Sequence, residues 1–209
     1  MENKLKFKIC GMRDPINMLE VAALDPDFMG FIFYEGSKRY VGQKFSIPIT
    51  FPQDVKRVGV FVNESVGNIL SKVSEHQLDF VQLHGDESID VCRELKEKIK
   101  VIKVFRVDES FDFNSTKEFN SHVDFFLFDT KGENYGGTGQ AFNWNLLKKY
   151  DQQIPFFLSG GLSIENIQSV KELRDLNLYA LDVNSQVELE PGMKDVKALN
   201  SIFSILNSF

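Results

Sequence analysis

Cysteine and long apolar runs are scarce in this sequence. Only two of the 209 residues are cysteine, Cys10 and Cys92, and neither lies within a metal-ligand spacing. We therefore expect no disulfide and no metal site. Apolar residues never continue for 18 positions, and the first residues lack a charged segment followed by an apolar one. These absences predict no membrane association and a cytosolic location.

Positive charge is also in deficit. The 30 acidic and 24 basic residues give a formal net charge of −6, and Lys and Arg form no block or stripe. Such a chain lacks the basic surface that nucleic-acid-binding proteins usually carry, so we expect no nucleic-acid partner. Phenylalanine, in contrast, is abundant, with 20 residues that fall mainly in short apolar runs. We interpret these side chains as core packing.

Short apolar runs alternate with helix-like segments along the whole chain. Eight runs are apolar almost without interruption, as parallel strands buried on both faces are: 7–10, 28–34, 58–62, 80–84, 101–107, 125–129, 156–159 and 178–183. Periodic segments between them include 66–73, 88–98, 143–150, 164–173 and 194–206. This alternation predicts one (β/α)8 TIM barrel domain over residues 1–209, with a doubly wound sheet as the alternative. Because Pro48 and Pro52 lie in the second crossover, we expect its helix to be shortened or missing.

The expected strand ends carry polar residues or glycine, where barrel enzymes hold their functional groups. The run 125–129 ends at Asp129, and the following segment contains four glycines, Gly132, Gly136, Gly137 and Gly139. Glycine lets the backbone approach a ligand closely, so this stretch suits an active site. In the alternative interpretation, Asp129 caps a turn and the glycines only bend the chain.

The first strand carries a candidate base. Lys8 and Cys10 are two residues apart on a strand, so their side chains lie on the same face. A nearby ammonium group lowers the pKa of a thiol, which makes Cys10 a candidate base or nucleophile. The alternative is that Cys10 is a small buried apolar residue. Cys92 lies in a helical segment, where simple burial is the favoured interpretation.

Two other strand ends carry groups suited to anions. Arg39 follows the second strand and is suited to bidentate binding of a carboxylate or phosphate, although a solvated surface arginine is the alternative. Gly160 and Gly161 precede a helix that we expect to start near residue 163, and N–H groups at a helix start bind anions. Asn184 and Ser185 follow the eighth strand beside them. An ordinary glycine turn is the alternative here.

Seven segments together point to one family. They are, in order, KICGMRD, GFIFYEGSKRYV, VGVFVNES, VQLHGDES, FDTKGENYGGTGQAFNW, LSGGLSIENI and DVNSQVELEPGMKD. Over nearly the whole chain they resemble N-(5′-phosphoribosyl)anthranilate isomerase, the third-step isomerase of tryptophan biosynthesis. The resemblance implies a (β/α)8 barrel that needs no metal or cofactor and acts on a small-molecule phosphoribosyl substrate. We expect a monomer, with a dimer as the alternative.

The resemblance also implies roles for the matching residues. Cys10 corresponds to the general base, Asp129 to the general acid, and Arg39 to the residue that holds the anthranilate carboxylate. The other expected substrate-binding residues are Gly160, Gly161, Asn184 and Ser185 at the phosphate, Gln82 and His84 in the pocket wall, Gly136 and Gly137 in a mobile loop, and Lys8 and Asp182. The expected reaction is an Amadori rearrangement. Asp129 protonates the furanose ring oxygen, and Cys10, kept ionised by Lys8, removes the proton from C2.

Departures from the family pattern and rival functions complete the interpretation. Gln186 stands where glycine is commoner in the family, which removes backbone freedom beside the phosphate.

The histidine-pathway aminoaldose isomerase resembles a duplicated barrel with a carboxylate base on strand one, whereas this chain has Cys10 and no half-barrel repeat. Indole-glycerol-phosphate synthase would need a lysine general acid and an N-terminal extension. A catalytically silent phosphosugar-binding barrel would have lost Cys10, Asp129 or Arg39, and all three are present.

Overall fold

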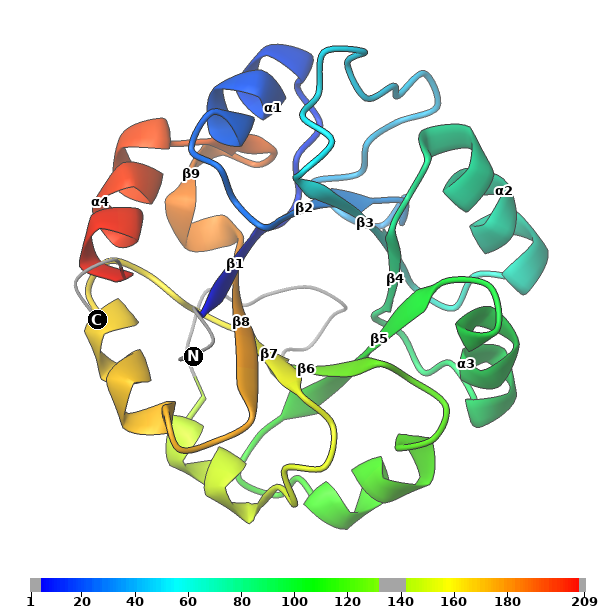
Figure 1. Ribbon diagram of the computed structural model, residues 1–209, viewed down its shortest axis with the longest axis vertical. Coiled ribbons are helices and arrows are strands. Elements are labelled where there is room, and N and C mark those ends of the chain that lie inside the picture. Colours follow the sequence, from blue (N-terminus) through cyan, green and yellow to red (C-terminus); the bar gives the residue numbers. More distant parts are fainter. Residues whose placement is uncertain (1–4, 132–141, 207–209) are drawn as a thin grey trace.

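The computed structural model describes residues 5–131 and 142–206, and eight parallel strands at its centre close into a barrel (Figure 1). The strands are β1 (Lys6–Ile9), β2 (Phe28–Ile32), β3 (Lys56–Phe61), β4 (Phe80–Leu83), β5 (Lys100–Val107), β6 (Phe125–Thr130), β7 (Phe156–Leu158) and β8 (Leu178–Val183). Their spatial order follows the sequence, and β1 pairs in parallel with β8 to close the ring. The (β/α)8 prediction is confirmed, and the doubly wound alternative is wrong.

Helices surround the barrel and carry the chain from most strands to the next (Figure 1). They are α1 (Pro15–Ala22), α2 (Val66–His76), α3 (Ile89–Lys96), α4 (Val196–Leu206) and the 3₁₀ helices η1 (Phe113–Phe119), η2 (Trp144–Lys149) and η3 (Ile167–Leu173). α1 and η1 lie outside the periodic segments singled out from the sequence. The start of α1 is nevertheless well specified, because the Asp14 side chain accepts hydrogen bonds from the N–H groups of Ile16 and Asn17.

The second crossover contains no helix among its residues 33–55, as Pro48 and Pro52 predict. Aromatic side chains cover this side of the barrel instead. The rings of Phe45 and Phe51 lie 5.3 and 6.3 Å from that of Phe31 on β2. The segment turns back to the end of β2, where the N–H of Val41 donates to the carbonyl of Ile32 at 3.0 Å. This return holds residue 39 over the barrel mouth.

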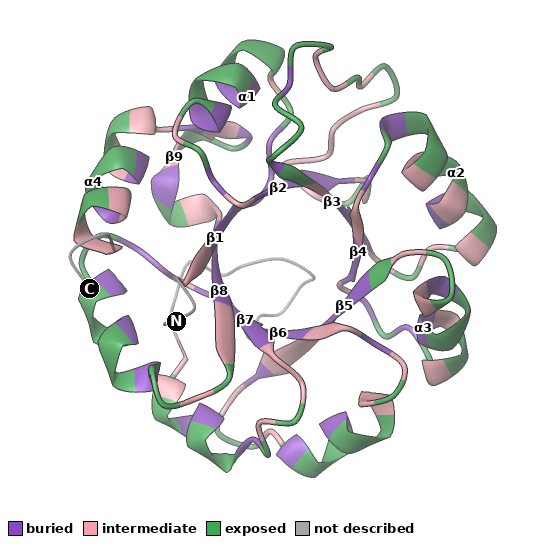
Figure 2. Ribbon diagram, viewed as in Figure 1, coloured by how far each residue is buried: buried purple, intermediate pink, exposed green. Residues whose placement is uncertain are grey.

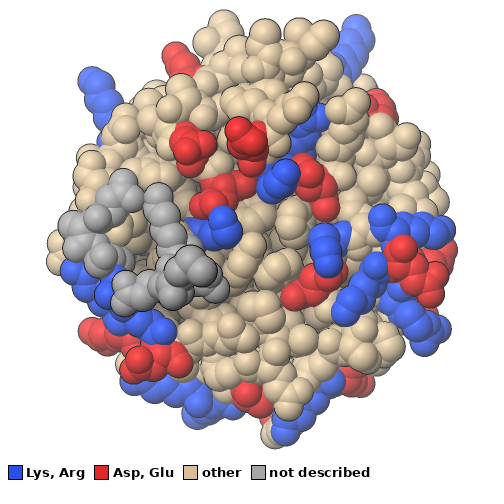
Figure 3. Space-filling model, in the orientation of Figure 1, with Lys and Arg blue, Asp and Glu red and all other residues tan. Residues whose placement is uncertain are grey.

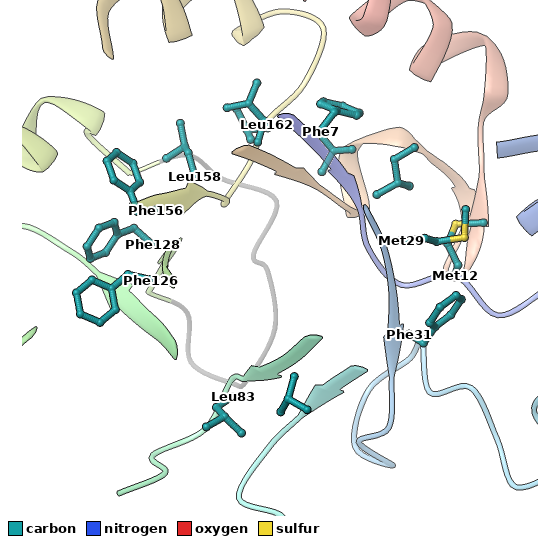
Figure 4. Close-up of a cluster of buried hydrophobic side chains, with 14 of the residues drawn as sticks. Phe7, Met12, Met29, Phe31, Leu83, Phe126, Phe128, Phe156, Leu158 and Leu162 are labelled. Atoms are coloured by element: carbon teal, nitrogen blue, oxygen red, sulfur yellow. The ribbon is translucent and has the colours of Figure 1, made fainter. Parts of the chain in front are cut away.

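Most of the core lies between the strands and the surrounding helices. Figure 2 shows buried residues along the strands and on the helix faces that point toward them, with exposed residues on the outer helix faces. In Figure 4, Phe126, Phe128 and Phe156 project from β6 and β7 side by side. Their neighbouring ring centroids are 6.2 and 5.3 Å apart. The phenylalanine-rich runs therefore supply core packing, as expected.

A short hairpin after β8 was not predicted. It follows the 3₁₀ turn η4 (Ser185–Val187) and consists of β9 (Glu188–Glu190) and the antiparallel β10 (Met193–Lys194). Pro191 and Gly192 form its turn, and the φ of +90° at Gly192 suits the third position of a type II turn. The hairpin contacts α1, so it is fixed against the barrel wall.

The molecular surface also bears on the expected partners. Within residues 5–131 and 142–206, no helix is long and apolar enough to cross a membrane. Among the described residues on the face drawn in Figure 3, basic side chains are interspersed with acidic ones, and no extended basic surface forms there.

Candidate active site

A pocket opens at the C-terminal ends of the barrel strands. The expected site residues among its lining are Cys10, Arg39, Gln82, His84, Asp129, Gly160, Gly161, Asp182, Asn184 and Ser185. These positions are widely separated in the sequence, and the barrel brings them together. Lys8 lies beneath this lining. Gly136 and Gly137 lie outside the described residues.

Lys8 and Asp182 form a buried ion pair on neighbouring strands. They are register partners on β1 and β8, and Lys8 Nζ donates to both carboxylate oxygens at 2.9 Å. The side chains are 0% and 4% exposed. Burial alone would lower the pKa of Lys8, but the charges of Asp182 and Cys10 raise it above its usual value. The surroundings therefore favour the charged form of Lys8, and Asp182 is already engaged by it.

Cys10 lies directly beside this pair. Gly30 on β2 leaves room for it, because a Cβ at that position would lie 2.8 Å from Cys10 Sγ and 3.2 Å from Lys8 Nζ. Burial raises the pKa of the Cys10 thiol, while Lys8 and Lys194 act in the opposite direction. Burial prevails, so the pKa of the Cys10 thiol lies above its usual value. Lys8 favours the ionised thiol, as expected, but acts against burial, so the ionisation of Cys10 by Lys8 stays a prediction.

Asp129 lies at the end of β6 with a histidine in front of it. Its Oδ1 accepts the N–H of Thr130 at 2.8 Å, and its Oδ2 is 3.4 Å from His84 Nε2. Gln82 Nε2 lies 2.9 Å from His84 Nδ1. When Gln82 donates to this nitrogen, the imidazole carries its proton on Nε2, facing Asp129. Gln82 and His84 thus form the part of the pocket wall that faces the Asp129 carboxyl group.

Two polar atoms in this wall are buried without a hydrogen bond to the described residues. They are Gln82 Oε1 and His84 Nε2. Buried polar atoms are rarely left without a partner, because the loss of hydration is costly. Both belong to residues that line the pocket, so a polar ligand there would find them available.

The glycine pair after β7 has the conformation that a close approach requires. Gly160 and Gly161 have φ angles of +86° and +66°. A Cβ at Gly160 would collide with the Thr130 side chain and lie 3.0 Å from Asp129 Oδ1. The backbone here therefore runs against the end of β6, and only glycine fits.

A turn begins at Ser163, where a helix start was expected: the N–H groups of Asn166 and Ile167 donate to the Ser163 carbonyl at 3.3 and 3.0 Å. η3 begins at Ile167, and the Asn166 side chain organises the residues before it. Asn166 Oδ1 accepts the N–H of Ser163 at 2.9 Å, and its Nδ2 donates to the carbonyl of Gly161 at 2.8 Å. A side chain that bonds back to the N–H three residues earlier is typical of a helix start. Any anion site here rests on the backbone of Gly160, Gly161 and this first turn.

Arg39 reaches the pocket from the second crossover and meets a partner that the sequence did not reveal. Its Nε donates to both Glu188 oxygens at 2.9 and 3.0 Å, and its Nη2 donates to Oε2 at 2.7 Å. Lys194 Nζ donates to the same carboxylate at 2.6 Å and to Asn184 Oδ1 at 2.8 Å. Glu188 and Lys194 belong to the motif DVNSQVELEPGMKD, but their pairing depends on the unpredicted hairpin.

Comparison with known proteins places this geometry in a family. The family model for N-(5′-phosphoribosyl)anthranilate isomerase matches residues 7–204. An isomerase of this name from Parabacteroides distasonis is 42% identical over 206 residues, covering 96% of this chain and 93% of the relative. The chain belongs to the N-(5′-phosphoribosyl)anthranilate isomerase family.

Solved structures of phosphoribosylanthranilate isomerases show the same fold. The Thermotoga maritima enzyme is 36% identical, with a TM-score of 0.85 over 98% of this chain and 100% of its own. Another isomerase structure, 34% identical with the same TM-score and the same coverage, was solved in complex with reduced 1-(o-carboxyphenylamino)-1-deoxyribulose 5-phosphate. This chain is accordingly an isomerase of tryptophan biosynthesis.

Proposed function

We propose that the barrel mouth binds N-(5-phosphoribosyl)anthranilate and that Cys10 and Asp129 carry out its rearrangement to 1-(2-carboxyphenylamino)-1-deoxyribulose 5-phosphate. The observation that carries this assignment is that both side chains line one pocket while standing on different strands, β1 and β6. On the shorter way round the ring, β7 and β8 stand between these two strands (Figure 1). An acid and a base can therefore reach one sugar from two directions.

The substrate has an anionic group at each end, and the pocket offers a group for each. We assign the anthranilate carboxylate to Arg39, whose guanidinium matches a carboxylate geometrically. We assign the phosphate to the backbone of Gly160 and Gly161 together with Asn184 and Ser185. Gln82 and His84 line the space between these two ends. Gly136 and Gly137 stay predictions, since they lie outside the described residues.

The chemistry needs one proton given and one removed. Asp129, protonated, donates to the furanose ring oxygen as the C1–O bond breaks, which opens the ring to a Schiff base. Cys10, as thiolate, removes the proton from C2, and the electron pair forms an enolamine. In the tautomerisation to the ketone, Cys10 gives its proton to C1 and Asp129 takes the proton of the C2 hydroxyl, which restores the thiolate and the acid. Burial opposes the thiolate, while Lys8 and Lys194 favour it. The rate of this step should therefore rise with pH.

Turnover of freshly generated phosphoribosylanthranilate, followed by its fluorescence decay, tests this assignment. We expect Cys10→Ser and Asp129→Asn each to lose about 10²- to 10⁴-fold in kcat, the usual contribution of a general acid or base. Cys92→Ser, which changes a second buried cysteine, is the matched control and should keep full activity.

The outcomes separate the parts of the proposal. Full activity in Cys10→Ser would remove Cys10 as the base but leave the substrate intact. Failure of the unmodified protein to convert phosphoribosylanthranilate would contradict the substrate, and the histidine-pathway aminoaldose would be tried next. A single domain, a monomeric state and a cytosolic location stay predictions.

A further inference from the structure

We infer that Glu188 and Lys194, on the β9–β10 hairpin, are positioning residues that orient Arg39 and maintain a net positive charge at the end of the pocket that receives the anthranilate carboxylate. Neither residue is among those that line the pocket, whereas Arg39 is. The inference rests on the proposed function, because it concerns how the carboxylate of that substrate is recognised.

Glu188 holds the guanidinium by one edge. The bonds from Arg39 to Glu188 come from Nε and Nη2, so one edge of the planar group is engaged. No hydrogen bond joins Arg39 Nη1 to another described residue. A second carboxylate can therefore approach the edge formed by Nη1 and the remaining Nη2 proton. The Glu188 side chain is 4% exposed and thus fixed by its surroundings. Arginine held in this way loses little freedom when substrate binds.

Lys194 makes up for the positive charge of Arg39 that Glu188 neutralises. An isolated Arg39–Glu188 pair is neutral and would attract a substrate carboxylate weakly. Lys194, with a side chain 0% exposed, adds a second cation 2.6 Å from Glu188, so the three groups together carry one positive charge. Burying one carboxylate between two cations also avoids an unpaired charge.

The fold fixes Lys194 at several atoms. Its backbone N–H donates to Asn17 Oδ1 at 2.7 Å, and Asn17 Nδ2 donates to its carbonyl at 3.0 Å. Its ammonium also donates to the side-chain and main-chain oxygens of Asn184 at 2.8 and 3.1 Å. The hairpin therefore connects α1, the loop after β8 and Arg39. The carboxylate end of the pocket and its expected phosphate end share this support.

A neighbouring glycine shows how closely these groups are placed. Gly11 has a φ of +80°, and a Cβ there would lie 2.7 Å from both Arg39 Cδ and Asn184 Oδ1. The arginine stem and the asparagine amide thus meet over the backbone that follows β1. This contact leaves Arg39 little space to turn away from Glu188.

The geometry also defines a competing interpretation. Glu188 could occupy the place of the substrate carboxylate and leave Arg39 when substrate enters. Removing its charge would then tighten binding of a carboxylated ligand. The supporting role predicts the reverse, and only for ligands that carry the carboxylate.

Calorimetric binding of two matched ligands to the full-length protein tests the inference. One ligand is reduced 1-(o-carboxyphenylamino)-1-deoxyribulose 5-phosphate, and the other is its phenylamino counterpart without the carboxylate. We expect Glu188→Gln to weaken the first ligand about 10- to 100-fold, as for loss of a charge-assisted contact, and the second by less than about twofold. In an Arg39→Lys background, Glu188→Gln should cause little further loss of affinity for the carboxylated ligand. Glu190→Gln, an exposed glutamate of the same hairpin, is the matched control and should change neither affinity.

Other variants keep the test independent of folding. Glu188→Asp retains the charge but shortens the reach, and it should also weaken only the carboxylated ligand. Circular dichroism establishes that each variant is folded. Equal weakening of both ligands, tighter binding of the carboxylated ligand, or additivity with Arg39→Lys would each overturn the inference. If the unmodified protein binds neither ligand, the proposed function itself fails, which is a distinct result.

A pH series gives a second readout. Burial lowers the pKa of Lys194 to about 8, against the opposing charge of Glu188. The charged or titratable groups that act on Lys194 are Glu188, Cys10 and Arg39. Loss of its proton removes the net positive charge, so the affinity advantage of the carboxylated ligand should shrink above about pH 8. An advantage that stays constant from pH 7 to 9 would contradict the role of Lys194.

Discussion

Cys10 and Cys92 are both buried, yet their surroundings give them different chemistry. Burial raises the pKa of Cys92 to about 11 within α3. Burial also raises the pKa of Cys10, but there Lys8 on β1 and Lys194 on the hairpin oppose it. Only Cys10 lines the pocket. The pocket thus holds a thiol whose ionised form has two nearby cations.

Alkylation of Cys10 should follow its ionisation. In Cys92→Ser protein, which leaves one thiol, we expect reaction with iodoacetamide to be slow at pH 7 and to accelerate as the pH rises above 9. The reason is that the thiolate is the nucleophile and burial keeps the pKa of Cys10 above its usual value. Mass spectrometry of the labelled protein measures the rate. Rapid labelling at pH 7 would show instead that the cations prevail over burial.

The sequence predicted most pocket residues because they lie at strand ends, which the apolar runs locate, with Arg39 in the second crossover as an exception. It did not predict the partner of Arg39, since the contact with Glu188 spans 149 positions and depends on a hairpin. It placed a helix start near residue 163, where the structure has a turn on the Ser163 carbonyl before η3 begins at Ile167. The bonds of the Asn166 side chain to Ser163 and Gly161 are not visible in hydrophobic periodicity.

At the scale of elements, the end of β6 depends on the glycine after β7. Gly160 has a positive φ and leaves no room for a Cβ beside Thr130 and Asp129. The position of Asp129, the proposed acid, is therefore set partly by the neighbouring loop. The loop after β8 depends in the same way on the hairpin, through the contact between Lys194 and Asn184.

Gly160→Ala should reduce activity more than its cost in stability explains. We expect a loss of about 1–3 kcal/mol, from left-handed backbone strain and the displaced Thr130, together with at least about a tenfold fall in kcat. Gly42→Ala is the matched control, because Gly42 has a φ of +84° but no atom within 4 Å of an added Cβ. It should lose stability without losing activity. Urea unfolding and turnover measure both effects, and equal kcat values in the two variants would contradict this role of Gly160.

Two helices and the hairpin were not singled out because their signals are short. α1 spans eight residues and η1 seven, so each offers few turns of periodic pattern. The hairpin strands have three and two residues. The strands of the barrel, in contrast, are buried on both faces and read as apolar runs. The apolar runs therefore predicted the strands of the barrel, but not every helix around it or the hairpin.

At the scale of the whole molecule, the ring closes where the first strand meets the last. Lys8 and Asp182 face each other across this β1–β8 seam, inside the barrel. Ends of the chain that are far apart in sequence are thus joined by backbone pairing and one buried ion pair. An ion pair at this seam affects the stability of the entire barrel.

Lys8→Met should destabilise the protein by about 3–5 kcal/mol, because Asp182 would be left as an uncompensated buried charge. Replacing both residues, Lys8→Met with Asp182→Leu, should recover much of this loss. Lys6→Met is the comparison, because Lys6 lies on β1 like Lys8 but forms a partly exposed ion pair with Asp27. It should lower the free energy of unfolding by less than about 1 kcal/mol. Chemical denaturation measures all three. A double variant no more stable than Lys8→Met would show that the ion pair is not the source of the effect.

The helix-free second crossover separates the proposed recognition of the carboxylate from the proposed proton transfer. Cys10 and Asp129 lie at the ends of barrel strands, whereas Arg39 lies in a segment, residues 33–55, that contains no helix. In the proposed function, substitutions, insertions or deletions in that segment would alter which acid Arg39 binds without moving Cys10 and Asp129. During evolution such a chain could change the aromatic acid of its substrate while it keeps the same rearrangement.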